Sequence, residues 1–364
     1  MSKPGTVSVT KKITETAEEV HAKILKGRSP TMVTPVRSLS NVKYQTRTGY
    51  FEMLGKSKHR TLTVSTVKTF ALTLKMMSLA KELIDTNDMA TKREAYYISK
   101  NWGKAGFSEQ SESDTIMDDV EAMFGVNREQ LRFTPEEKGG DVTGRLIVID
   151  TDARCKRLKI DCTKFGSGAY SIPTEVEDLQ FRSDARFILA IETAGMFQRL
   201  VKYDYWKRAN CILISMGGVP PRACRRFIRR LAEKLKIPVY AFVDGDPYGY
   251  FNIYRTLKVG SGNAAHLNRF FCVPSASFLG VTPEDIVAYK LPTHPLKEVD
   301  IKRAKDALRN DPFVKHHKPW QKAINQMLKM GVRVEQQAFA KHGLGFVVNK
   351  YLPSKLKDPS KFLP

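Results

Sequence analysis

Long apolar stretches are missing from this sequence of 364 residues. A membrane-spanning helix needs about 20 consecutive apolar residues. The longest apolar runs here, such as residues 187–191 and 239–243, reach about a quarter of that length. The first residues, Met1-Ser-Lys-Pro-Gly5, lead into polar and charged sequence without the apolar segment of a secretory signal. We therefore expect a soluble chain without a membrane partner.

Cysteine is also scarce, and no two cysteines form a Cys-x-x-Cys pair. The seven histidines show no spacing typical of metal ligands, which argues against a structural zinc site. An odd number of scattered cysteines is typical of reduced thiols, so we expect a cytoplasmic protein. The five cysteines are Cys155, Cys162, Cys211, Cys224 and Cys272.

Negative charge is in short supply, because 38 Asp and Glu residues face 60 Lys and Arg residues, a net charge of +22. An excess this large favours a polyanionic partner. The 42% of hydrophobic residues is typical of a globular protein, and the length predicts about two domains. The chain also lacks a Gly-x-x-x-x-Gly-Lys-Ser/Thr phosphate loop, and we interpret Gly260-Ser-Gly262 as a turn. Any use of ATP must then take place elsewhere.

Three helices are predicted in the first half of the chain. Apolar residues recur with a period near 3.6 from 67 to 84, and residues 91–94 (TKRE) have the form of a capping box. Residues 113–114 can cap a third helix that ends at Gly125, and a β-rich run follows at 145–149. Three helices followed by strands are typical of a winged helix, a common DNA-binding architecture. The alternative is a small helical subdomain without a nucleic-acid role.

The second half of the chain has the pattern of an α/β domain. Three short, continuous apolar runs at 187–191, 211–214 and 238–243 are separated by helical stretches. Such runs indicate strands of a parallel sheet that are buried on both faces.

One predicted helix of this domain carries a row of arginines. It is expected to begin at Pro220-Pro221, which suit a first helical turn, and its apolar residues fall on the opposite face from the arginines. We expect the apolar face to pack on the sheet and the arginines to meet DNA phosphates. The alternative is an ordinary solvated face, although a single nearby acidic residue, Glu233, is not typical of a salt-bridged one. The arginines are Arg222, Arg225, Arg226, Arg229 and Arg230.

Three carboxylates follow two of the predicted strands. Glu192 ends the first strand, and Asp244 and Asp246 end the third. The carboxyl ends of parallel strands lie at one edge of a sheet, where functional side chains gather. Clustered carboxylates repel one another unless a cation neutralises them, and oxygen ligands favour Mg²⁺. We therefore predict a magnesium site, with a simple Asp-Gly-Asp-Pro turn as the alternative.

A second candidate site is the tyrosine pair Tyr96-Tyr97 in the helix that begins after Thr91. Arg93 and Tyr97 are four residues apart, so they share a helix face. A tyrosine has a pKa of about 10 and needs a nearby cation or base to act as a nucleophile. Arg93 distinguishes Tyr97 from Tyr96. The alternative is that both tyrosines only pack in a core or an interface.

Taken together, these motifs resemble a known family. The residues are 91–97 (TKREAYY), 191–197 (IETAGMF) and 244–249 (DGDPYG), in that order. They resemble the A subunits of DNA topoisomerase VI, which are type IIB topoisomerases. Further similar stretches lie at 165–169, 279–286, 300–304 and 351–356, so the resemblance covers roughly residues 67–356. It implies a multidomain α/β protein with a CAP-like winged helix and a TOPRIM sheet.

The resemblance also implies the roles of the site residues. Tyr97 would attack a DNA phosphodiester and become linked to the 5′ end, beside Arg93. Glu192, Asp244 and Asp246 would hold Mg²⁺, and the two sites would meet across a homodimer. Many TOPRIM sequences have a lysine after the glutamate, whereas this chain has Thr193.

The resemblance implies partners as well. ATP would be bound by a separate B subunit in an A₂B₂ heterotetramer that passes one DNA duplex through a transient break in another. We expect an N-terminal arm at 1–66, with a helix at 13–25, to contact that second protein. The winged helix would span 67–150, a connecting segment 151–183, and the TOPRIM domain with its C-terminal extension 184–364. The nearest alternative function is the related meiotic double-strand-break transesterase, and a third is a non-catalytic DNA-binding scaffold.

Overall fold

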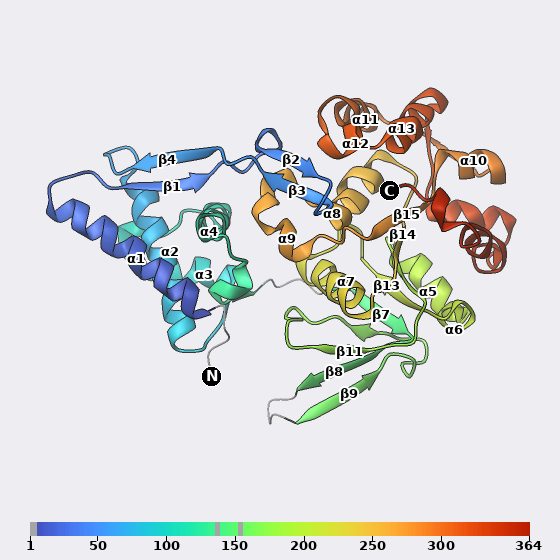
Figure 1. Cartoon of the computed structure of the whole chain (residues 1–364), viewed down its shortest axis with the longest axis horizontal. Helices are drawn as coiled ribbons and strands as arrows, with labels where there is room; N and C mark the ends of the chain where they lie inside the picture. The colour runs from blue at the N-terminus through green and yellow to red at the C-terminus, as the bar shows by residue number, and fades with distance from the viewer. Residues whose placement is uncertain (1–5, 135–138, 152–155) are drawn as a thin grey trace. The chain divides into compact units, whose positions relative to one another are not determined.

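The computed structural model describes residues 6–134, 139–151 and 156–364 (Figure 1). The chain divides into two compact units. The first unit comprises Met1–Val42, Glu52–Glu137 and Gly262–Phe270, and the second comprises Lys43–Phe51, Lys138–Ser261 and Phe271–Pro364. The chain passes between the two units after residues 42, 51, 137, 261 and 270.

The first unit is built on helices. They are α1 (Thr6–Leu25), α2 (Val67–Asp85), α3 (Lys92–Ile98) and α4 (Gln110–Phe124), with 3₁₀ turns at Ser99–Ala105 and Arg128–Leu131. Their apolar faces form one core, in which Met76, Phe107 and Met117 are at most 1% exposed. The expected arm helix and the helix from residue 67 are both present. The third helix begins at Gln110, three residues before the predicted cap, and its end at Gly125 is confirmed by a left-handed φ of 62°.

Short strands accompany these helices (Figure 1). Strand β1 (Thr31–Pro35) pairs antiparallel with β4 (Ser57–Thr61), and β5 (Ala90–Thr91) pairs parallel with β6 (Phe133–Thr134). Strands β2 (Val42–Gln45) and β3 (Tyr50–Met53) form a further two-stranded sheet, most of whose residues belong to the second unit.

The strands that we expected to complete the winged helix belong instead to the second unit. Strand β7 (Asp141–Gly144) pairs with a strand of the large sheet, and β8 (Ile147–Thr151) lies in a separate three-stranded sheet. Gly144 has a φ of 112°, and a Cβ there would lie 2.6 Å from the carbonyl oxygen of Cys211. This close approach, which only glycine allows, holds β7 against the large sheet.

The large sheet of the second unit has six strands in the order β10-β7-β13-β12-β14-β15. Strands β12 (Phe187–Ile191), β13 (Cys211–Ser215), β14 (Val239–Phe242) and β15 (Ala276–Gly280) run parallel, whereas β7 joins antiparallel and β10 (Tyr170–Ser171) covers its edge. The predicted parallel sheet is therefore confirmed. Every residue of β12 and β13 is buried, as the continuous apolar runs indicated.

Helices flank the large sheet (Figure 1). The helices that follow β12 along the chain are α5 (Ala194–Lys202), α6 (Tyr205–Ala209), α7 (Arg222–Leu235), α8 (Arg255–Lys258), α9 (Asn268–Phe271), α10 (Pro283–Tyr289), α11 (Glu298–Asn310), α12 (Pro312–His316), α13 (Lys318–Met330) and α14 (Leu352–Lys355). Most of α9 belongs to the first unit. None of the helices in the described ranges is long and apolar enough to cross a membrane.

A smaller antiparallel sheet lies beside helix α7. It contains β8, β9 (Arg157–Asp161) and β11 (Gln180–Arg182), and the ring of Phe181 in β11 lies 5.2 Å from that of Phe227 in α7. Strands β16 (His294–Pro295) and β17 (Val332–Arg333) form a last pair. Four cysteines, Cys162, Cys211, Cys224 and Cys272, are buried free thiols, and Cys155 lies outside the described residues.

Candidate active site

The structure brings the three predicted carboxylates to one edge of the parallel sheet, and we call Glu192, Asp244 and Asp246 the acidic edge. Strands β12 and β14 are hydrogen-bonded neighbours, so the residues that follow them lie side by side. The backbone N–H of Asp244 donates to Oε2 of Glu192 at 2.8 Å. The backbone N–H of Gly249 donates to Oδ1 of Asp246 at 2.6 Å and fixes the turn after the second aspartate.

Burial and mutual repulsion disfavour the charged forms of these carboxyl groups. Burial, followed by the charge of Asp244, raises the pKa of Glu192 to about 8. Burial and the charges of Asp246 and Glu335 raise the pKa of Asp244 to about 6. The pKa of Asp246 is also raised, mainly by burial. At neutral pH Glu192 is therefore mostly protonated unless a cation offsets its charge, and the raised pKa values of the two aspartates favour cation binding in the same direction.

This donor set fits a hard cation such as Mg²⁺ in its chemistry and its charge. Carboxylate oxygens are the ligands that Mg²⁺ prefers, and a bound cation would offset the burial and mutual repulsion that raise the pKa values of Glu192 and Asp244. Within the described ranges, however, no three His, Cys, Asp or Glu side chains already converge as a metal cage. One oxygen of each carboxylate is instead held by a backbone N–H, which fixes the groups in place.

Helix α3 presents the tyrosine pair. The predicted capping box is present, because the N–H of Glu94 donates to Oγ1 of Thr91 at 3.1 Å and the N–H of Thr91 donates to Oε2 of Glu94 at 2.6 Å. Ala95, on the same helix, is buried and faces the core of the first unit. The cap sets where the helix begins and therefore which residues point outward.

The two tyrosines have different surroundings. Tyr96 is half-buried, its hydroxyl donates to the carbonyl oxygen of Ser108 at 3.4 Å, and the ammonium of Lys100 lies 4.2 Å from its ring centre. Tyr97 is 58% exposed, and Arg93, one turn earlier on the same helix, is exposed too. The structure thus leaves Tyr97 and Arg93 open to an incoming ligand while Tyr96 anchors the helix to the following loop.

The arginines of α7 are not an open row, and this corrects our expectation that they lack acidic partners. Arg226 pairs with Glu177 at 2.5 Å and Arg229 with Glu233 at 2.8 Å. Arg230 donates to the carbonyl oxygens of Val176 and Leu179. Arg222 and Arg225 both lie 5.7 Å from the ring of Phe271, and all five arginines are half-buried.

Two features near these sites were not found from the sequence. Segment 333–336 contacts the acidic edge, since the backbone N–H of Gln336 donates to Oδ1 of Asp244 at 2.8 Å. Nothing in the local sequence connects residues 92 positions apart. The second feature is helix α4, which has five acidic and no basic residues. This one-sided composition is the sequence signal for a helix that needs basic partners.

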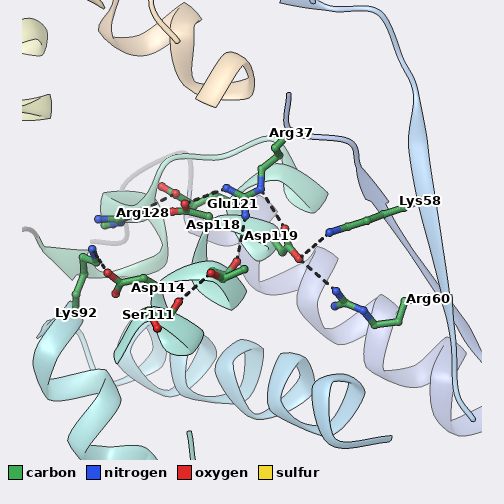
Figure 2. Close-up of polar contacts among 11 residues, drawn as sticks. Arg37, Lys58, Arg60, Lys92, Ser111, Asp114, Asp118, Asp119, Glu121 and Arg128 are labelled. Atoms are coloured by element: carbon green, nitrogen blue, oxygen red, sulfur yellow. Dashed lines mark hydrogen bonds and ion pairs between the residues drawn. The ribbon is translucent and has the colours of Figure 1, made fainter. Parts of the chain in front are cut away.

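Figure 2 shows how α4 is neutralised. Asp118, Asp119 and Glu121, which we call the α4 acidic face, meet basic side chains from other segments of the same unit. Arg37 contacts both aspartates, at 3.0 and 3.1 Å, and Lys58 and Arg60 of β4 contact Asp119 at 3.4 and 3.5 Å. Arg128 contacts Asp118 at 2.9 Å and Glu121 at 3.7 Å. Nearer to the tyrosines, Lys92 of α3 pairs with Asp114.

Comparison with known proteins gives matches along most of the chain. Residues 68–133 match a family model described as type IIB DNA topoisomerase. Residues 136–185 match the all-beta domain in the alpha subunit of DNA topoisomerase VI. Residues 187–356 match the Toprim domain shared by Spo11 and the A subunit of topoisomerase 6.

Curated relatives match over nearly their whole length. A protein of Methanocaldococcus jannaschii, named as the A subunit of type 2 DNA topoisomerase 6, is 55% identical over 97% of this chain and 95% of its own length. Proteins of the same name from Methanothermobacter thermautotrophicus and Archaeoglobus fulgidus are 37% and 36% identical. The former alignment covers 92% of this chain and 93% of the relative, and the latter covers 94% of each.

Proposed function

This chain belongs to the family of DNA topoisomerase VI A subunits, the DNA-cleaving subunits of type IIB topoisomerases, and from that premise we propose that Tyr97 is its nucleophile. The supporting observation is the exposure of Tyr97 on a capped helix, one turn after the exposed Arg93, whereas Tyr96 is held by Ser108 and Lys100. A side chain that must reach a phosphodiester has to be accessible, and Tyr97 is the more exposed of the two tyrosines.

The chemistry is a transesterification. The phenolic oxygen of Tyr97 attacks the phosphorus, the new bond from tyrosine to phosphorus forms, and the bond to the 3′ oxygen breaks. The phenol loses its proton to solvent, and the leaving 3′ oxygen takes one up. One phosphodiester replaces another, so the step is reversible without an energy source. The guanidinium of Arg93 would stabilise the charge on the phosphoryl oxygens in the transition state.

The acidic edge is proposed to hold Mg²⁺ through Glu192, Asp244 and Asp246. When bound, the ion would supply further positive charge to the phosphoryl oxygens. The protein contributes the placement of the three carboxylates at adjoining strand ends and the backbone N–H groups that fix them.

The remaining partners are proposals that follow from family membership. They are duplex DNA, a second copy of this chain, and a B subunit that binds ATP in an A₂B₂ heterotetramer. The N-terminal arm, which includes α1 and strands β1 and β4, is proposed to contact the B subunit. The net charge of +22 supports the assignment of DNA as the substrate, and the compartment that we propose is the cytoplasm.

The test is a covalent trap. The chain, mixed with a B subunit, Mg²⁺, ATP and labelled duplex DNA, is denatured rapidly, and protein is sought on the 5′ ends. We expect Tyr97→Phe to eliminate the adduct and Tyr96→Phe to retain it. An adduct that persists in Tyr97→Phe would overturn the assignment of the nucleophile.

The same mixture separates the alternative functions. Relaxation of supercoiled DNA indicates a topoisomerase, whereas breakage without relaxation indicates a double-strand-break transesterase. Salt-sensitive DNA binding with no adduct at all indicates a non-catalytic scaffold.

A further inference from the structure

Residues 333–336, which we call the strap, cross the loop that carries two of the three carboxylates of the acidic edge. Val334 and Gly245 exchange two backbone hydrogen bonds, at 2.8 and 3.1 Å. A Cβ on Gly245 would lie 2.6 Å from Cγ1 of Val334 and 2.7 Å from the carbonyl oxygen of Val281. Only glycine permits this contact, so the loop between Asp244 and Asp246 is shaped to receive the strap.

Gln336 makes three hydrogen bonds from a position with no exposed surface. Its backbone N–H donates to Oδ1 of Asp244 at 2.8 Å, and its side-chain Nε2 donates to the carbonyl oxygen of Phe242 at 2.6 Å. Its Oε1 accepts from the hydroxyl of Thr193 at 2.9 Å. A buried amide with both ends satisfied is rigid and costly to disturb.

These bonds join the ends of two strands that each carry a carboxylate. Thr193 directly follows Glu192 and also caps helix α5 through the N–H of Met196. The carbonyl oxygen of Phe242, two residues before Asp244, also accepts from the N–H of Glu192 at 3.0 Å. Gln336 therefore fixes the separation between the strand end at Glu192 and the strand end at Asp244.

The strap also brings a cation to the acidic edge. Nη1 of Arg333 lies 3.9 Å from Oδ2 of Asp246 and 3.8 Å from Oε1 of Glu335. This long ion pair offsets the charge of the carboxylates only in part, because the pKa values of Asp244 and Asp246 remain raised beside it.

We propose that Gln336 is a positioning residue for the metal site, which sets the spacing of Glu192 and Asp244 through Thr193 and the end of β14. The inference rests on the proposed function of the acidic edge and adds a residue that acts through the carboxylates. Groups that orient metal ligands typically change metal affinity by about 10- to 100-fold when they are removed.

The experiment measures the binding of Mg²⁺ alone to the full-length chain by isothermal titration, together with the Mg²⁺ dependence of adduct formation in the complete complex. Gln336→Met keeps the length of the side chain and removes its amide. Gln337→Met is the matched control, because the neighbouring Gln337 is exposed. We expect the dissociation constant and the half-saturating Mg²⁺ concentration to rise about tenfold in Gln336→Met only, with the adduct recovered at high Mg²⁺.

A second pair of variants tests the same hydrogen bond from its other partner, in case Gln336→Met does not fold. Thr193→Val removes the hydroxyl that bonds to Gln336, and Thr193→Ser restores it. We expect weaker Mg²⁺ binding in the valine variant and normal binding in the serine variant. Unchanged Mg²⁺ affinity in both Gln336→Met and Thr193→Val overturns the inference, provided that Asp244→Asn weakens binding. If Asp244→Asn binds Mg²⁺ and cleaves normally, the proposed metal site itself fails.

Discussion

The α4 acidic face and the acidic edge both bury carboxylates, but they are neutralised in opposite ways. Asp119 on α4 is 1% exposed and has cationic nitrogens of Arg37, Lys58 and Arg60 within 3.5 Å. At the acidic edge, Glu192 is 8% exposed, and the ion pair found there in the described part of the chain, Arg333 with Asp246, spans 3.9 Å. Asp119 has several close countercharges within the fold, whereas the acidic edge has one long ion pair among the described residues.

The difference separates carboxylates that serve the fold from those that serve chemistry. A buried charge with close partners stabilises one arrangement of its segments, here β4 and the residues after β1 against α4. A buried charge without them is costly, and this cost is recovered when a ligand cation binds. It follows that the acidic residues of α4, the charged residues of that helix, tie basic segments of the first unit to it.

The largest effect is expected from Asp244→Asn. Adduct formation should fall at least about a hundredfold, because the change removes charge that stabilises the transition state through the metal. DNA binding at moderate salt should stay nearly intact. The folded protein should be no less stable without metal, since the amide oxygen can still accept from the N–H of Gln336 and a repelling charge is gone. Normal cleavage without added metal would remove the distinction between the two groups.

Asp119→Asn tests the other side of the comparison. We expect a loss of about 3 kcal/mol in the free energy of unfolding, because three cations lose a shared buried partner. Chemical denaturation measures this loss. Asp85→Asn, which breaks the surface pair with Lys81, is the control and should cost less than about 1 kcal/mol. Equal losses in both variants would mean that the α4 network contributes no more than a surface pair.

The sequence predicted the parts of the two sites that depend on local pattern. Thr91 and Glu94 predicted the start of α3, and buried apolar runs placed Glu192 and Asp244 at neighbouring strand ends. Contacts between distant segments leave no such pattern. Arg37 and Asp119 are 82 residues apart, and Gln336 is 92 residues from Asp244. For the same reason the partner of Arg226, Glu177, was missed, and α7 was expected to be more open than it is.

The pH dependence of stability should also distinguish the acidic edge from the α4 acidic face, with a smaller effect than these substitutions. Folding raises the pKa of Glu192 from 4.5 to about 8 and that of Asp244 from 3.8 to about 6, mainly by burial. At a pH between the unfolded and the folded pKa of either group, the metal-free folded chain keeps a proton that the unfolded chain has released. The stability that these groups provide is therefore complete below about pH 4 and is lost as the pH rises through about 6 and then about 8.

Magnesium should reverse this trend, because it replaces the protons. The rise in melting temperature that Mg²⁺ produces should be larger at pH 8 than at pH 6, because fewer protons compete for the carboxylates at pH 8. The difference should be about 2 °C for each kcal/mol by which this competition weakens the stabilisation by Mg²⁺. Thermal melts with Mg²⁺ and with EDTA measure it, and Asp119→Asn should show the same Mg²⁺-dependent difference. A difference between Mg²⁺ and EDTA that is constant across this pH range would contradict the assignment of these carboxyl groups as ligands.

The smallest effect is expected for the arginines of α7, which extend the comparison from carboxylates to cations. Arg229 already donates to Glu233 and to the carbonyl oxygen of Cys272, at 2.8 and 3.0 Å. An arginine that is already paired within the fold neutralises DNA phosphates poorly, so few counterions leave the DNA when it binds. Replacing Arg225 and Arg229 together by Gln should therefore lower duplex affinity by less than about tenfold. The slope of log affinity against log salt concentration should become shallower by the amount that corresponds to about one phosphate contact. An unchanged slope would place both arginines with the α4 acidic face, as charges that the fold uses itself, whereas a drop of two contacts would show that DNA displaces Glu233.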